Sequence, residues 1–198
     1  MSILRRGTLS LLRVVSARVS QNELFEQEGE RKKHSPLELV APNVQSVEVT
    51  IPLEECLIAT ALQIQKVLQN PQKWLLVNHW ATWCDPCVEE FPLLRMMNEQ
   101  LNDFTLVGIS WDLFEGGQPA SIADRVADFS QQHNLGYGSW LVVDPPDLFF
   151  ENLQVEYKKI PQTWVISPTG ERLLTIEGVV TEKHISQIRQ IQQSHNPS

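Results

Sequence analysis

Residues 74–92 read WLLVNHWATWCDPCVEEFP and combine a continuous apolar run, a Cys-x-x-Cys pair and the start of a helical pattern. The run Trp74–Val77 is apolar throughout, which is typical of a strand buried on both faces of a sheet. From Asp85 onward, the apolar residues recur instead at helical spacing. The sequence therefore predicts that Cys84 and Cys87 lie where a buried strand passes into a helix.

This position suits the two cysteines to reversible disulfide chemistry. The free N–H groups and the dipole at a helix start stabilise a thiolate on Cys84, which makes it the expected nucleophile. Cys87 lies one turn later, and we expect it to resolve a mixed disulfide by attacking Cys84. Pro86 suits a helix start, where its missing N–H costs nothing. Asp85 repels a neighbouring thiolate, which favours a reductant over an oxidant.

Strand and helix patterns alternate along the rest of the chain. Strand patterns occupy residues 46–51, 104–111, 140–143, 163–166 and 172–176, helical spacing occupies 57–68, 85–101, 122–134 and 185–191, and turn signals occupy 144–147 and 167–170. Alternation of this kind predicts an α/β fold with a central, mostly parallel sheet and helices on both faces. The turn at 167–170 makes the last two strands an antiparallel hairpin.

Composition excludes several classes of protein. The chain has 198 residues, of which 42% are hydrophobic, and this suits one domain of about 150 residues with some additional chain. Three cysteines are too few, and odd in number, for a disulfide-stapled scaffold. A net charge of −8 argues against nucleic acid as a partner. No run of about 18 apolar residues is present, so no transmembrane helix is predicted.

The beginning of the chain differs from the rest. We predict that residues 1–44 form a basic N-terminal segment and a polar tether, and that residues 45–198 form the folded domain. Residues 1–20 contain four arginines and no acid. Arg5 and Arg6 precede the apolar residues 7–15, as in an export signal or a membrane-surface segment, but Arg13 interrupts this stretch. A disordered basic arm is the alternative.

Residues 77–87, followed by Glu90-Phe91-Pro92, resemble thioredoxin-like thiol-disulfide oxidoreductases of the TlpA/ResA type, whose pattern is roughly VNFWATWCxPCxxEhP. Residues 160–164 (IPQTW) similarly match the proline loop of that family. The resemblance covers about residues 45–193. It implies a thioredoxin fold with a central mixed sheet, and reduction of protein disulfides with electrons from a thiol donor. It favours an extracytoplasmic location, in the periplasm or at a membrane, over a cytoplasmic one.

The resemblance also implies roles for individual residues. Pro161 matches a cis-proline that sits against the disulfide, and Ile160 before it offers backbone groups to a substrate strand. Glu90 matches an acid near the second cysteine, which makes it a candidate proton acceptor for Cys87. The catalytic residues expected are Cys84, Cys87 and Glu90, and the substrate-binding residues expected are Trp83, Asp85, Pro86, Ile160 and Pro161.

Separate expectations apply to three further residues. Asn78 occupies the position where ordinary thioredoxins have a buried aspartate, so the proton-transfer role of that aspartate is absent. His79 replaces an aromatic residue, and we expect it to be a packed histidine. Cys56 falls in the helix predicted from residue 57, and we expect a buried, inert thiol there.

Other functions compete with the reductase hypothesis. A copper or zinc delivery module could use Cys84 and Cys87, although no methionine or histidine is placed to complete such a site. A peroxidase of the peroxiredoxin type requires a threonine three residues before its cysteine, where this chain has Ala81. A scaffold without chemistry conflicts with the complete active-site stretch. We expect no cofactor, no bound metal and no nucleic acid, and residues 1–20 allow association with a membrane surface.

Overall fold

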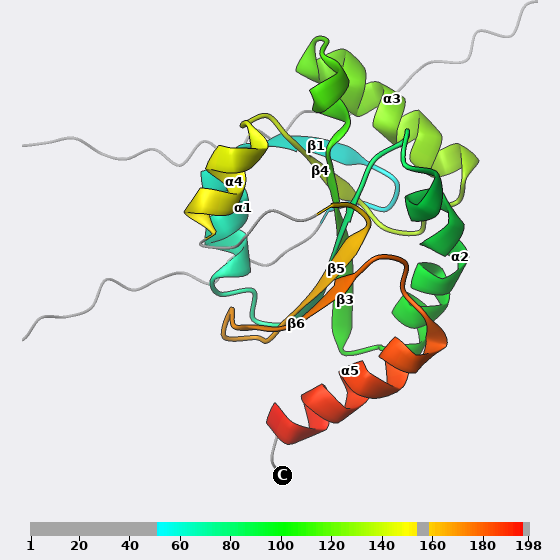
Figure 1. Cartoon of the computed structure of the whole chain (residues 1–198), viewed down its shortest axis with the longest axis vertical. Coiled ribbons are helices and arrows are strands. Elements are labelled where there is room, and N and C mark those ends of the chain that lie inside the picture. The colour runs from blue at the N-terminus through cyan, green and yellow to red at the C-terminus, as the bar shows by residue number, and fades with distance from the viewer. Residues whose placement is uncertain (1–50, 154–158, 196–198) are drawn as a thin grey trace, which may run out of the picture. The chain divides into compact units, whose positions relative to one another are not determined.

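The structure, a computed structural model, describes residues 51–153 and 159–195 (Figure 1). Its strands are β1 (Cys56–Ala59), β2 (Trp74–Trp80), β3 (Phe104–Ser110), β4 (Ser139–Val142), β5 (Gln162–Ile166) and β6 (Arg172–Glu177). Its helices are α1 (Ala61–Leu68), α2 (Asp85–Gln100), the short 3₁₀ helix η1 (Asp112–Glu115), α3 (Pro119–Gln132), α4 (Pro146–Asn152) and α5 (Glu182–His195). The predicted segment 1–44 lies outside the described residues.

One mixed sheet organises these elements. Its six described strands follow the order β1-β4-β3-β2-β5-β6. Strands β1 to β4 run parallel to one another, whereas β5 pairs antiparallel with β2 and with β6. The sheet therefore confirms the predicted α/β thioredoxin fold. The carboxyl ends of the parallel strands meet at one edge, and β2 ends there immediately before the Cys-x-x-Cys pair.

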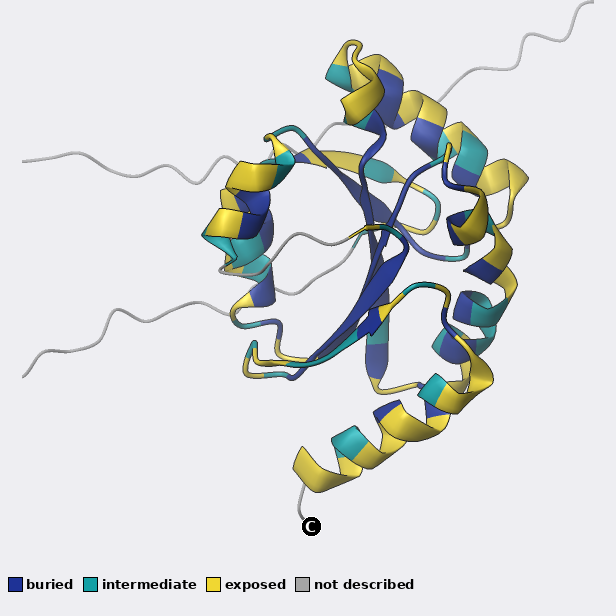
Figure 2. Ribbon diagram, in the orientation of Figure 1, coloured by how far each residue is buried: buried dark blue, intermediate teal, exposed yellow. Residues whose placement is uncertain are grey.

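Two helical layers cover the sheet. Helices α1 and α4 lie on one face, and α2, α3 and α5 lie on the other (Figure 1). Successive side chains of β2 point to opposite faces of the sheet, and the strand is buried along its whole length because a helical layer covers each face. Trp80 packs edge-on against Phe91 of α2, and His79 contacts Phe149 and Phe150 of α4. Buried residues fill the four inner strands β2 to β5, while the edge strands β1 and β6 and the outer helix faces are more exposed (Figure 2).

The first strand and helix differ from the prediction. Residues 46–50 lie outside the described residues, and the first described strand is β1, which the periodicity from residue 57 assigned to a helix. Leu57 and Ile58 are exposed on this edge strand, so their apolar character does not belong to a helical stripe. The helix begins only after Thr60, whose side chain accepts from the Gln63 N–H in a capping box. Cys56 is consequently a strand residue, which corrects its predicted place.

Helix α4 is a further difference, because the sequence indicated only a turn at residues 144–147. Pro145 and Pro146 stand at the helix start, where proline is well tolerated. Phe149 and Phe150 are then buried against the sheet, so tertiary packing stabilises a helix of seven residues. No helix in the described parts of the chain is long and apolar enough to cross a membrane.

Candidate active site

Cys84 and Cys87 form a disulfide at the start of α2, as the sequence predicted for a strand-to-helix junction. Cys84 is the N-cap residue, with extended backbone angles (φ −98°, ψ 91°). Its carbonyl accepts from the N–H of Cys87 at 2.9 Å and of Val88 at 3.2 Å, and so begins the helix. Cys84 therefore stands at the positive end of the α2 dipole.

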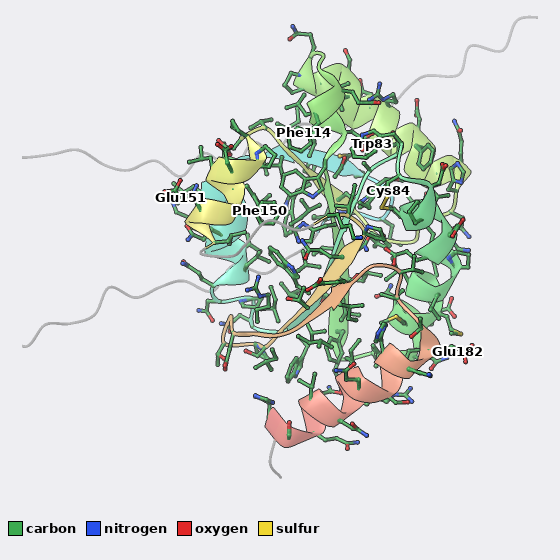
Figure 3. All side chains as sticks on the ribbon, viewed as in Figure 1. Trp83, Cys84, Phe114, Phe150, Glu151 and Glu182 are labelled. Carbon is green, nitrogen blue, oxygen red and sulfur yellow. A yellow bond between two sulfur atoms is a disulfide. The ribbon has the colours of Figure 1, made fainter. Side chains whose placement is uncertain are left out.

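The two sulfur-bearing residues differ in exposure. Cys84 is 6% exposed, whereas Cys87 is fully buried. Trp83, labelled beside Cys84 in Figure 3, is 45% exposed, and Asp85 and Pro86 are exposed in the first turn of α2. Attack from outside can therefore reach only Cys84, and the predicted substrate-binding residues around it are open to a partner.

The proline loop meets the same edge of the sheet. The Ile160–Pro161 peptide bond is cis, as expected, and Pro161 is buried while Ile160 is half-buried. The next residue, Gln162, begins β5 and pairs with His79 near the end of β2. Two segments far apart in sequence are thus brought to one edge of the sheet.

Glu90 lies one turn beyond Cys87 on the same side of α2 and is 1% exposed. Both of its carboxylate oxygens accept hydrogen bonds: Oε1 from Nδ2 of Asn78 at 2.7 Å, and Oε2 from the Val180 N–H at 2.9 Å. Asn78 accepts in turn from the Tyr137 hydroxyl at 2.9 Å. Glu90 is therefore a buried acid held in place on both oxygens, unlike its exposed neighbour Glu89.

Burial controls the protonation of this acid. It raises the pKa of Glu90 to about 7, although the hydrogen bonds from Val180 and Asn78 act in the opposite direction. Burial, together with the nearby Glu90 charge, raises the pKa of Tyr137 well above its usual value. A carboxyl group with a pKa near 7 can take up and release a proton at neutral pH.

His79 lies on the opposite face of β2 from this acid. Trp111 donates from Nε1 to Nδ1 of His79 at 3.3 Å, and Nε2 has no hydrogen-bond partner among the described residues. Aromatic rings of Trp111, Phe150 and Trp164 surround the imidazole. Burial, helped by the Arg172 charge, lowers the pKa of His79 to about 3. His79 is a neutral, packed histidine, as predicted.

Cys56 stands apart from the disulfide. It is half-buried in β1 and is a free thiol. Burial, with a smaller effect of the Asp112 carboxylate, raises the pKa of Cys56 to about 12. Such a thiol carries almost no thiolate at neutral pH, which agrees with the inert role predicted for it. Within residues 51–153 and 159–195, no group of three or more potential ligands is arranged to hold a metal ion.

The sequence did not indicate Asp112, Tyr137 or Thr163 as parts of the site. Thr163 Oγ1 accepts from Asn78 at 3.2 Å, and Asp112 accepts from Thr82 two residues before Cys84. These contacts join strands and loops that are remote in sequence. The only local signal was an acid directly after a buried strand, which places Asp112 at the edge occupied by Cys84.

Comparison with known proteins agrees with this geometry. The model of the AhpC/TSA family matches residues 51–171. The thiol-disulfide oxidoreductase ResA of Bacillus subtilis (strain 168) is 26% identical over 113 residues, which make up 57% of this chain and 58% of that protein. ResA of Geobacillus kaustophilus (strain HTA426) is 27% identical over 121 residues, 59% of this chain and 64% of that protein.

Solved structures are similar as well. The crystal structure of StoA from Bacillus subtilis covers 60% of this chain and 83% of its own length, with a TM-score of 0.45 and 18% identity. This chain spans less than two thirds of the length of either ResA protein. The two ResA matches confirm the TlpA/ResA resemblance that the active-site stretch carries.

Proposed function

We propose that this chain, which belongs to the AhpC/TSA family, is a thiol-disulfide oxidoreductase that reduces disulfides in protein substrates. The observation that carries the proposal is the Cys84–Cys87 disulfide at the N-terminus of α2, in which Cys84 keeps 6% exposure and Cys87 has none. Similarity to relatives named thiol-disulfide oxidoreductase supports the same activity.

The reaction proceeds in two exchanges. The Cys84 thiolate of the reduced protein attacks one sulfur of the substrate disulfide, forms a mixed disulfide and releases a substrate thiolate, which takes up a proton. The Cys87 thiol then loses its proton, and its thiolate attacks Sγ of Cys84. This step closes the Cys84–Cys87 disulfide and releases the second substrate thiolate. The substrate gains two electrons and two protons, and a thiol donor later returns them to the protein.

Glu90 is the proposed acceptor of the Cys87 proton. It follows Cys87 by one helical turn, and its pKa of about 7 lets the carboxylate accept a proton at neutral pH. Asn78, at the position of the buried aspartate of ordinary thioredoxins, is an amide and cannot fill that role. The second exchange therefore depends on Glu90.

The substrate approaches over the exposed edge of the site. Trp83, Asp85 and Pro86 supply contact surface around Cys84, and the backbone of Ile160 beside Pro161 pairs with an extended substrate segment. A cavity of about 280 Å³ opens between the residues that follow β3 and β4. It is lined by Trp111, Leu113, Phe114 and the segment 142–146, and it suits an apolar side chain of the partner.

We also propose a direction and a location for this activity. Asp85 places a negative charge next to Cys84, which disfavours the thiolate and makes the couple more reducing. We place the activity outside the cytoplasm, in the periplasm or at the membrane surface, in line with the TlpA/ResA resemblance. Labelling of Cys84 in intact Cys56→Ser cells with a membrane-impermeant maleimide, after treatment with a membrane-impermeant phosphine that reduces the disulfide, tests that location, because a cytoplasmic protein would be protected.

Two other functions are less well supported. Metal delivery requires further ligands beside Cys84 and Cys87, and the described residues supply no such group. Peroxide reduction requires a threonine hydroxyl three residues before the cysteine, but Ala81 is there, and the hydroxyl of Thr82 is bonded to Asp112. Consumption of hydrogen peroxide and metal content after purification distinguish these functions from disulfide exchange.

The reduction potential of the Cys84–Cys87 couple tests the proposal. The protein, with Cys56→Ser as background, is equilibrated in graded thiol buffers, and its free thiols are mass-tagged. A potential below about −240 mV, with turnover of insulin disulfides, supports a reductase. A potential above about −180 mV makes the protein an oxidase or an isomerase instead. Failure of the pair to form a disulfide rejects disulfide exchange altogether.

A further inference from the structure

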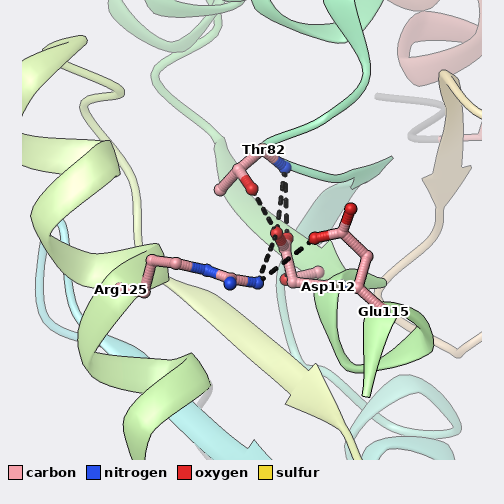
Figure 4. A network of polar contacts seen from close by, with 5 residues as sticks. Thr82, Asp112, Glu115 and Arg125 are labelled. Carbon is pink, nitrogen blue, oxygen red and sulfur yellow. Dashed lines mark hydrogen bonds and ion pairs between the residues drawn. The ribbon is translucent and has the colours of Figure 1, made fainter. Parts of the chain in front are cut away.

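A buried carboxylate holds the turn that leads into the active site. Asp112, the first residue of η1, is completely buried (Figure 4). Its two oxygens accept from the Thr82 N–H at 3.2 and 3.1 Å, and Oδ1 also accepts from the Thr82 hydroxyl. Ser110 donates to Oδ2 at 2.7 Å. Every contact of Asp112 with the turn is therefore made through Thr82.

The turn from Ala81 to Cys84 is short and is fixed at few points. The Cys84 N–H donates to the Ala81 carbonyl at 3.2 Å, and the Trp111 N–H donates to the Trp80 carbonyl at 3.0 Å. Between these bonds, Asp112 holds both the backbone and the side chain of Thr82. The direction in which Trp83 and Cys84 leave the sheet is thus set by η1, an element that follows the neighbouring strand.

The charge of Asp112 is only partly balanced. Arg125 of α3 places Nη2 at 3.8 Å from Oδ1 of Asp112 and at 3.4 Å from Oε2 of Glu115. Arg125 is 49% exposed, so solvent screens its attraction, whereas the Asp112 carboxylate is removed from solvent. A net negative potential consequently remains beside the turn that carries Cys84.

We propose that Asp112 is a positioning residue for disulfide exchange: it fixes the Thr82 turn that presents Cys84, and its charge disfavours the Cys84 thiolate. The second effect destabilises the reduced form of the couple and makes it a stronger reductant. This inference rests on the proposed oxidoreductase function. It assigns part of the reducing character to a residue outside the Cys-x-x-Cys segment.

Charge and position are tested by separate variants. Asp112→Asn keeps the shape and removes the charge, so the pH midpoint for alkylation of Cys84 by iodoacetamide should fall by about one unit. The equilibrium constant for reduction by glutathione should rise by about tenfold. Arg125→Gln leaves the buried carboxylate and removes its cation, so the pH midpoint should rise by about 0.3 unit and the equilibrium constant should fall by about twofold, because solvent screens Arg125.

Position is tested at Thr82. Thr82→Val removes the hydroxyl that binds Asp112, so exchange with insulin should slow by about tenfold, and Thr82→Ser should restore the rate.

Glu115→Gln is the matched control for Asp112→Asn, because Glu115 contacts Arg125 but not Thr82. The charge effect is refuted if Arg125→Gln leaves the alkylation midpoint and the glutathione equilibrium constant at their wild-type values. It is also refuted if Glu115→Gln shifts these two quantities as much as Asp112→Asn does. Equal rates for Thr82→Val and wild type refute the positioning effect.

The alkylation measurements are independent of the proposed function, whereas the insulin rates depend on it. Alkylation of Cys84 reports its thiolate in a protein that turns over no disulfide at all. Loss of insulin turnover in the wild type would reject the oxidoreductase proposal. Unchanged alkylation profiles in active variants would reject only the role of Asp112.

Discussion

Nδ2 of Asn78 donates to Oε1 of Glu90 over 2.7 Å, and this hydrogen bond joins the central strand to the active-site helix in the protein interior. The amide donates but cannot accept a proton at neutral pH, so it orients the acid without competing for the proton. The Val180 N–H holds the other oxygen at 2.9 Å. Among Asn78, Glu90 and Val180, only Glu90 has a side chain that can take up or release a proton.

Replacement of Glu90 by glutamine should slow the second exchange more than the first. Without a proton acceptor near Cys87, resolution of the mixed disulfide should fall by about a hundredfold at pH 7, while attack by Cys84 changes little. Rapid-quench analysis of the Cys84 mixed disulfide with a thiol-reactive peptide measures both steps. The mixed disulfide should accumulate in the variant and stay transient in the wild type.

Glu89→Gln is the matched control for this variant, because Glu89 is the adjacent, exposed acid on the same helix. It should resolve the mixed disulfide at the wild-type rate. Equal slowing in both variants would indicate a general effect of helix charge, and an unchanged rate in Glu90→Gln would remove Glu90 from the mechanism.

The same acid should make folding stability depend on pH. The folded pKa of Glu90 is about 7, above its ordinary value of 4.5, so the folded protein binds more protons than the unfolded chain between these values. Wild-type stability should therefore fall, relative to Glu90→Gln, as pH rises from 4.5 to 7. The difference should reach about 3 kcal/mol by linkage. Urea unfolding of both proteins at each pH measures it, and a constant difference would contradict the raised pKa.

Local patterns predicted much of the fold. The apolar run from Trp74 and the helical spacing from Asp85 are properties of neighbouring residues, so β2, α2 and the disulfide between them could be predicted from sequence. The β5–β6 hairpin followed from its turn signal in the same way. The start of α1 could also have been found, because Thr60 and Gln63 have the spacing of a capping box.

The supporting contacts of the site could not be predicted in this way. Asp112 meets Thr82 across 30 positions, Tyr137 meets Asn78 across 59, and Val180 meets Glu90 across 90. No local period relates residues at such separations, and only the strand order brings them together. The sequence therefore indicated the residues that we propose to react, and the fold shows which residues contact them.

Gly108 should tolerate no side chain. A Cβ added there would meet Ser139 Oγ at 2.1 Å and Trp80 Nε1 at 2.7 Å, the two atoms of a buried hydrogen bond between β2 and β4. Gly108→Ala should lower the free energy of unfolding by about 2 kcal/mol through overpacking. Thermal unfolding measures the loss. Ser139→Ala, which removes the hydrogen bond without crowding, is the control, and an equal loss in both variants would contradict overpacking as the cause.

His79 should limit stability in acid. Its folded pKa of about 3 lies below the ordinary value of 6.5, so the unfolded chain binds the extra proton between these values and stability falls as pH decreases. Phenylalanine fits the aromatic surroundings formed by Trp111, Phe150 and Trp164 and does not titrate. His79→Phe should therefore gain stability relative to wild type as pH falls from 6.5 toward 3, by at most about 5 kcal/mol.

Urea unfolding at fixed pH values measures this gain, and His133→Asn is the control because His133 is exposed. The two effects of pH on folding stability oppose each other between pH 4.5 and 6.5. The contribution of the buried acid Glu90 to stability increases as pH falls, whereas that of His79 increases as pH rises. Removal of His79 should consequently leave a protein whose stability decreases steadily with pH across this window. Parallel curves for His79→Phe and wild type from pH 7 to pH 4 would show that the imidazole takes up its proton in the folded state as readily as in the unfolded chain.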